Sequence, residues 1–118
     1  MNKKLYLSFF LLSMVLQQAS LQALVNISNY SSYKVTIKSQ QSNLPDIDLV
    51  ANGGVKYGLI AQGYCTQNKI TVFTNQTNPS FELKLDVNCA SGANYSINIL
   101  NNDPSIAAKI PLRAEYFQ

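Results

Sequence analysis

The chain has 118 residues, carries a formal charge of +3 and contains no histidine. This length allows one domain with a modest core, and the lack of histidine argues against Ser-His-Asp or Cys-His catalysis and against the usual transition-metal sites. The small charge and the absence of a glycine-rich phosphate loop argue against nucleic-acid and nucleotide ligands, so we expect no catalytic residue, no metal site and no cofactor.

Residues 1–23 have the layout of a secretory signal peptide. Two lysines near the start form a positive region, residues 5–16 are apolar apart from two serines, and a polar stretch then closes on Ala23. An apolar run of about twelve residues is too short for a membrane span. We therefore expect export to the periplasm or the extracellular space, and the short basic region with an asparagine-rich chain favours a bacterial source.

Cleavage after Ala23 predicts a single mature domain over 24–118 with no membrane span. The two lysines of the signal leave with it, so the mature domain is close to neutral. Leu21, at the third position before the cut, is larger than the residue usual there. The expected cleavage position therefore has a margin of a few residues.

Beyond residue 23, apolar and polar residues alternate with period two, the pattern of half-buried strands. The clearest alternation lies in 81–87, and no window shows the 3.6-residue stripe of a helix. The pattern predicts strands over 24–30, 33–38, 46–50, 55–60, 69–74, 81–87, 95–99 and 106–117. Seven to eight short strands separated by turn residues predict an all-β protein, a small antiparallel β-sandwich of immunoglobulin-like type.

Two local signals predict how some of these strands connect. Asn52-Gly53 accepts positive φ and predicts a hairpin between 46–50 and 55–60. Pro111 lacks an N–H group, which favours either an edge position or a bulge in the last strand. If the protein associates with itself through an edge, the first and last strands are the expected candidates.

Cys65 and Cys89 are the two cysteines of the chain. An even number of cysteines in an exported protein predicts a disulfide. Cys89 has the same parity as the apolar residues of 81–87, so its side chain is expected to point toward the core. A free reactive thiol is disfavoured because no histidine is available to stabilise a thiolate.

Tyrosine and asparagine side chains supply the best candidates for a binding surface. Strand parity turns three tyrosines toward the core: Tyr33, Tyr57 and Tyr95. Tyr30 and Tyr64 remain as the expected exposed pair, and tyrosine buries contact area at little entropic cost. Loop-based recognition would use Tyr64 within 58–67, or Asn75 and Asn78 within the next turn.

The acidic residues offer two weaker alternatives. Asp46 and Asp48 share a strand face and provide hard oxygen ligands of the kind that calcium prefers, although a solvated polar face is the favoured interpretation. Glu82 and Asp86 lie about 13 Å apart along one extended strand, too far for an acid/base pair. A small carboxylate-dependent hydrolase would need a partner carboxylate from another strand.

Two stretches resemble known secreted subunits. Residues 85–99 (LDVNCASGANYSINI) are similar to the strand-Cys-turn-Tyr-strand hairpin of spore-coat-U-type pilin subunits. Residues 110–117 (IPLRAEYF) resemble the closing strand of chaperone-usher fimbrial subunits. The resemblance implies an incomplete immunoglobulin-like sandwich, completed by a strand from a neighbouring subunit and able to polymerise.

These patterns together predict an exported, non-enzymatic β-sandwich module that binds a protein or glycan partner. A pilin-like structural subunit of a surface fibre is the first alternative, and the small hydrolase is the second.

Overall fold

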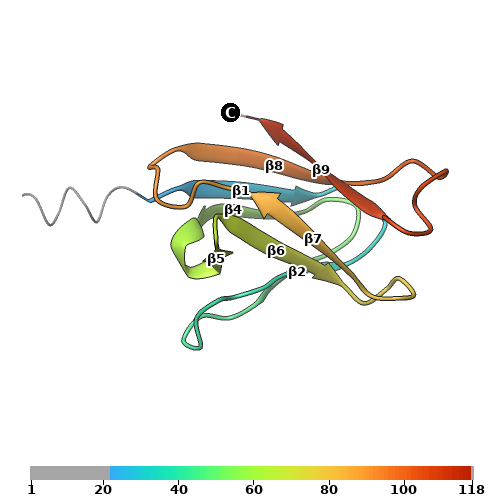
Figure 1. Cartoon of the computed structure of the whole chain (residues 1–118), viewed down its shortest axis with the longest axis horizontal. Coiled ribbons are helices and arrows are strands. Elements are labelled where there is room, and N and C mark those ends of the chain that lie inside the picture. The colour runs from blue at the N-terminus through green and yellow to red at the C-terminus, as the bar shows by residue number, and fades with distance from the viewer. Residues whose placement is uncertain (1–21, 118) are drawn as a thin grey trace, which may run out of the picture.

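The computed structural model describes residues 22–117 and folds them into two β-sheets that pack face to face (Figure 1). One sheet has the order β4–β1–β8–β9, and in the other β3, β2 and β6 follow one another, with β5 and β7 on opposite edges of β6. The strands are β1 (Leu24–Asn29), β2 (Val35–Ile37), β3 (Ile47–Leu49), β4 (Gly54–Ile60), β5 (Cys65–Thr66), β6 (Lys69–Thr74), β7 (Phe81–Asp86), β8 (Asn94–Asn101) and β9 (Leu112–Phe117). The predicted small β-sandwich is confirmed.

The core lies between the sheets and follows the alternation in the sequence. Side chains that alternate along β1, β2, β6 and β8 point inward and are fully buried. They are Val25, Ile27, Val35, Ile37, Ile70, Val72, Ile97 and Ile99. Each such side chain stabilises the fold by about 1.5–3 kcal/mol relative to an exposed one, so the inward stripe is the main source of stability.

Strand number and direction differ from the prediction in three respects. The described residues form nine strands rather than seven to eight, because β5 is a two-residue strand that leaves no periodic signal. The last strand begins at Leu112 rather than residue 106, since Ala107 N–H donates to the Asp103 carbonyl and Ile110 N–H to that of Ile106. One pair, β1 with β8, is parallel, a direction that alternation does not encode.

The Asn52-Gly53 turn connects the two sheets and does not close a hairpin. Both residues have the expected positive φ, 60° and 127°. However, β3 pairs with β2 in one sheet and β4 pairs with β1 in the other. The predicted hairpin is therefore wrong, although the predicted turn conformation is correct.

The first strand is central, so it is not available for the edge recognition for which it was a candidate. β1 pairs with β4 on one side and, over all six residues, with β8 on the other. The last strand, β9, is an edge, one of the two alternatives predicted, since it pairs with β8 alone in its sheet. The other strands with a free edge are β3, β4, β5 and β7.

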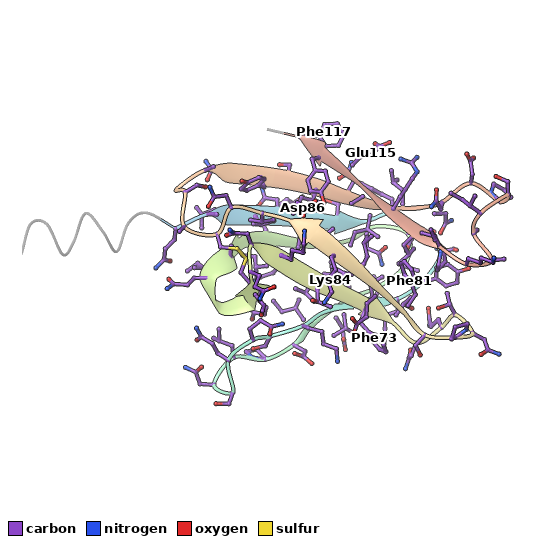
Figure 2. All side chains as sticks on the ribbon, viewed as in Figure 1. Phe73, Phe81, Lys84, Asp86, Glu115 and Phe117 are labelled. Carbon is purple, nitrogen blue, oxygen red and sulfur yellow. A yellow bond between two sulfur atoms is a disulfide. The ribbon has the colours of Figure 1, made fainter. Side chains whose placement is uncertain are left out.

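Each of these edges carries a feature that discourages pairing with another strand. β3 and β5 have three and two residues, and β4 contains a bulge at Tyr57-Gly58, where the register with β1 shifts. Charged side chains alternate along β7, among them Lys84 and Asp86 (Figure 2). Along β9, Arg113 pairs with Glu115 at 2.6 Å. Short, bulged and charged edges are common protections against edge-to-edge association.

The bulge also explains why Tyr57 does not face the core. Gly58 has φ of 66°, and its N–H donates to the Asn26 side-chain oxygen at 2.8 Å. The extra residue interrupts the alternation, and Tyr57 is 72% exposed. The parity prediction is wrong for Tyr57, whereas Tyr33 and Tyr95 are partly buried against the core as expected.

The predicted disulfide joins Cys65 at the start of β5 to Cys89 in the loop after β7. Both residues pack against the buried cluster. The bond therefore ties the turn that precedes β5 to the β7–β8 loop, at the end of the sandwich from which β1 starts.

Candidate functional site

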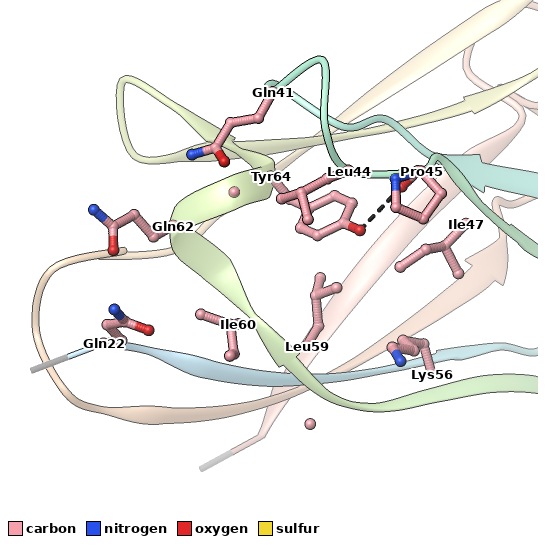
Figure 3. A pocket seen from close by; sticks show the side chains of 12 residues that line it. Gln22, Gln41, Leu44, Pro45, Ile47, Lys56, Leu59, Ile60, Gln62 and Tyr64 are labelled. Atoms are coloured by element: carbon pink, nitrogen blue, oxygen red, sulfur yellow. Dashed lines mark hydrogen bonds between the residues drawn. The ribbon is translucent and has the colours of Figure 1, made fainter. Parts of the chain in front are cut away.

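A groove of about 480 Å³ opens where the free edges of β3 and β4 face each other (Figure 3). Its walls come from the β2–β3 loop, from β4 and from the 3₁₀ turn η1 (Ala61–Tyr64). The lining residues are Gln22, Gln41, Leu44, Pro45, Ile47, Lys56, Gly58, Leu59, Ile60, Gln62, Gly63 and Tyr64. This volume is within the range of ordinary ligand sites.

Tyr64 holds the apolar wall of the groove together. The residue is only 6% exposed, and its hydroxyl donates to the Pro45 carbonyl at 3.0 Å, the dashed line in Figure 3. A second bond, from Gln40 N–H to the Gly63 carbonyl at 3.0 Å, also joins the β2–β3 loop to η1. The loop is therefore fastened to the turn, and the groove walls are held in place.

Close packing at Gly63 completes this wall. A Cβ atom at Gly63 would lie 2.2 Å from Cδ1 of Leu44. That separation is far below contact distance, so any larger residue there must displace the Leu44 side chain. The constraint at Gly63 is therefore one of space, set by the end of the Leu44 side chain, rather than one of backbone conformation.

We expect Gly63→Ala to lower the free energy of unfolding by about 1–2 kcal/mol, because the added methyl group overpacks the loop against η1. Urea denaturation measures this change. Gln62→Ala is the matched control, since Gln62 is the exposed neighbour in the same turn and should change stability by less than about 0.5 kcal/mol. Equal stabilities of the two variants would show that the Leu44 contact is not tight.

The rim of the groove is polar and carries one positive charge. Three amide side chains, from Gln22, Gln41 and Gln62, surround the apolar wall, and Lys56 projects from β4 (Figure 3). The four ion pairs formed within residues 22–117 do not include Lys56. The lining contains no acidic residue. The groove is thus apolar inside, amide-rich at the rim and positive at β4.

The predicted binding residues lie at opposite ends of the sandwich. Tyr64 was expected to be exposed, which is wrong, but its buried ring is part of the groove wall. Tyr30 is 52% exposed beyond the end of β1. Asn75 and Asn78 are exposed on the β6–β7 loop, and Asn78 lines a smaller cavity of about 230 Å³ against the β8–β9 loop. The four residues therefore do not form one surface.

Sequence reasoning indicated part of the groove and missed the rest. The segment 58–67, proposed as a recognition loop, supplies half of the lining residues. Gln22 was missed because it lies inside the predicted signal peptide. Leu44 was missed because it meets η1 only through the packing of two sheets, and Lys56 was missed because it lies on β4 just outside the segment 58–67.

Asp46 and Asp48, the two carboxylates of the calcium alternative, each accept a hydrogen bond from a neighbouring residue. Asp46 accepts from Ser39 N–H at 2.8 Å and lies 3.7 Å from the Lys38 ammonium, while Asp48 accepts from the Thr36 hydroxyl at 2.7 Å. Across residues 22–117, no group of three or more His, Cys, Asp or Glu side chains is placed to hold a metal ion. The calcium alternative gains no support from this geometry.

Comparison of the sequence with protein-family models and with curated proteins finds no match. Within the part of the chain that the structure describes, no helix has the length and apolar character needed to cross a membrane. The groove is therefore the feature from which a function is best inferred.

Proposed function

We propose that the chain is an exported, non-enzymatic binding module that holds a segment of a protein partner in the groove between β3 and β4. The observation that carries the proposal is the lining of this groove, with apolar walls and a rim of side-chain amides. An apolar side chain of the partner would enter the groove and exclude water. The glutamine amides offer both donors and acceptors to a peptide backbone.

Charge complementarity narrows the chemistry of the partner. Lys56 is the charged side chain of the lining and forms no ion pair among the described residues. A carboxylate next to the inserted apolar side chain would meet this ammonium at the edge of the groove. The preferred partner is therefore a peptide segment that combines a bulky apolar residue with a neighbouring acidic one.

A protein partner is favoured over a glycan by the state of Tyr64. Sugar recognition commonly uses the open face of an aromatic ring beside hydrogen-bonding groups. The ring of Tyr64 is nearly covered, and its hydroxyl already donates to Pro45. The apolar side chains around it, Leu44 and Leu59 among them, suit an aliphatic or aromatic side chain better.

The pilin-like alternative has less support from the arrangement of strands. Completion by a neighbouring subunit requires an unfilled place in a sheet, and β1 already pairs on both sides. The free edges are short, bulged or charged, which disfavours self-association. A self-contained binding module agrees better with these features.

Selection of peptides from a random library displayed on phage tests the proposal. We expect enriched peptides to carry an apolar residue beside an acidic one and to bind Lys56→Glu at least tenfold more weakly than the unaltered protein, a difference of about 1.4 kcal/mol. Lys109→Glu is the control, because this exposed lysine lies at the other end of the sandwich and receives the same change of charge. Peptides equally sensitive to both variants, or binding to a glycan array alone, would refute a peptide-binding groove.

A further inference from the structure

Ala23 belongs to the folded domain. Its side chain is fully buried within the hydrophobic cluster. Its N–H donates to the Cys89 carbonyl at 3.3 Å, and its carbonyl accepts from Ala61 N–H at 3.0 Å. One residue therefore joins the start of the chain both to the β7–β8 loop and to η1.

The residue before it also has a structural position. Gln22 is only partly exposed and lines the groove between β3 and β4. The folded part of the chain thus includes residues that the sequence pattern assigns to the signal peptide. A mature chain that starts at Leu24 would lack both of them.

Removal of Ala23 would leave two backbone groups without their partners. The Ala61 N–H loses its acceptor although Ala61 is fully buried, and the Cys89 carbonyl loses its donor. Buried backbone groups without partners are strongly disfavoured in folded proteins.

We propose that the leader is removed at the Ala19–Ser20 bond, so that residues 20–23 remain on the mature protein. Ala19 is the nearest alanine upstream of Gln22, in the polar stretch that follows the apolar run. Gln17, at the third position before this bond, is no smaller than Leu21, so the choice between the two alanines rests on the folded position of Ala23. Hydrolysis breaks the C–N bond of this peptide group. Water supplies hydroxyl to the Ala19 acyl carbon and a proton to the Ser20 nitrogen. The inference rests on the proposed export.

The intact mass of the exported protein tests this assignment. The full chain is expressed in a bacterial host, and the secreted or periplasmic product is weighed by mass spectrometry. We expect a chain that begins at Ser20. A chain that begins at Leu24, lighter by the four residues 20–23, would overturn the assignment and leave the proposed export intact. A product that retains Met1 would overturn both.

Two substitutions locate the processed bond independently of folding. Ala19→Leu places a large residue directly before the proposed bond and is expected to leave the precursor unprocessed on a denaturing gel. Ala23→Leu is the matched control and should be processed normally, even if its product folds poorly. The reverse result, with processing blocked only by Ala23→Leu, would contradict the proposal.

A stability comparison tests the structural reason for the assignment. Mature chains 20–118 and 24–118 are released from an exchanged signal sequence with a defined cut. We expect the shorter chain to melt about 10 °C lower, because it loses both backbone hydrogen bonds and the buried side chain of Ala23, and the melting temperature of a small domain falls by roughly 4–8 °C for each 1 kcal/mol of stability lost. Equal melting temperatures would show that Ala23 contributes nothing to the fold and would overturn the inference.

Discussion

Replacement of Asn29 by alanine is expected to lower the free energy of unfolding by about 4 kcal/mol, because this one side chain joins several chain segments. Asn29 is fully buried. Its amide nitrogen donates to the carbonyls of Tyr33 at 2.8 Å, Leu49 at 3.2 Å and Val50 at 3.1 Å. Its oxygen accepts from the N–H and the hydroxyl of Ser31. Each buried group left without a partner costs about 1–3 kcal/mol.

Urea denaturation of Asn29→Ala measures this loss. Asn94→Ala is the matched control, since Asn94 is an exposed strand asparagine, and its removal should change stability by less than about 0.5 kcal/mol. Asn29→Asp keeps the size and the acceptor oxygen but removes the donors, so it should be destabilised by at least half as much as the alanine variant. If Asn29→Ala unfolds at the same urea concentration as the control, the hydrogen bonds of the Asn29 side chain do not stabilise the fold.

Asn29 also explains why the strands could be predicted while their connections could not. The alternation within 24–30 and 95–99 is local, and both segments form strands as expected. After β3 the chain leaves one sheet and enters the other at β4. At this crossing, the Asn29 amide donates to the carbonyls of Leu49 and Val50. This contact spans about twenty residues of sequence, so the Asn52-Gly53 turn alone gave no indication of it.

The two tyrosine corrections have distinct physical causes. Parity failed for Tyr57 because the bulge at Tyr57-Gly58 adds one residue to β4, so the strand alternates out of phase on its two sides and Tyr57 does not share a face with buried Leu59. Exposure was wrongly predicted for Tyr64 because it lies in a 3₁₀ turn, and the β2–β3 loop packs over it. Both depend on backbone geometry that a period-two pattern does not contain.

The groove was only partly predictable for a similar reason. Its β4 and η1 wall is one continuous segment, and turn-rich composition indicated 58–67 as a recognition loop. The opposite wall, with Leu44 and Ile47, comes from another sheet. Because this wall is distant from η1 in the sequence, the contact between Leu44 and η1 could not be predicted from a local pattern. The contact forms only when the two sheets pack.

Removal of the disulfide is expected to destabilise the domain by about 3.5 kcal/mol. Cys65 and Cys89 are separated by 24 positions, and a closed loop of that length restricts the unfolded chain by about this amount in the loop-entropy description. The double variant Cys65→Ala/Cys89→Ala measures the effect by urea denaturation. Addition of a thiol reductant should bring the unaltered protein to the same midpoint and leave the double variant unchanged, which separates loss of the bond from loss of the cysteine side chains.

The bond should matter more for the groove than for the sheets. Cys65 directly follows Tyr64 in the chain. The Cys89 carbonyl accepts from Ala23 N–H, and the Cys89 N–H donates to the Asn68 side-chain oxygen. Without the bond, the turn η1 remains attached mainly through Tyr64 and Ala61. We therefore expect amide hydrogens of residues 61–66 to exchange at least tenfold faster in the double variant under native conditions, with a smaller change in the central strands β1 and β8. Uniform acceleration along the chain would instead indicate that the disulfide acts only through global unfolding and does not shape the groove.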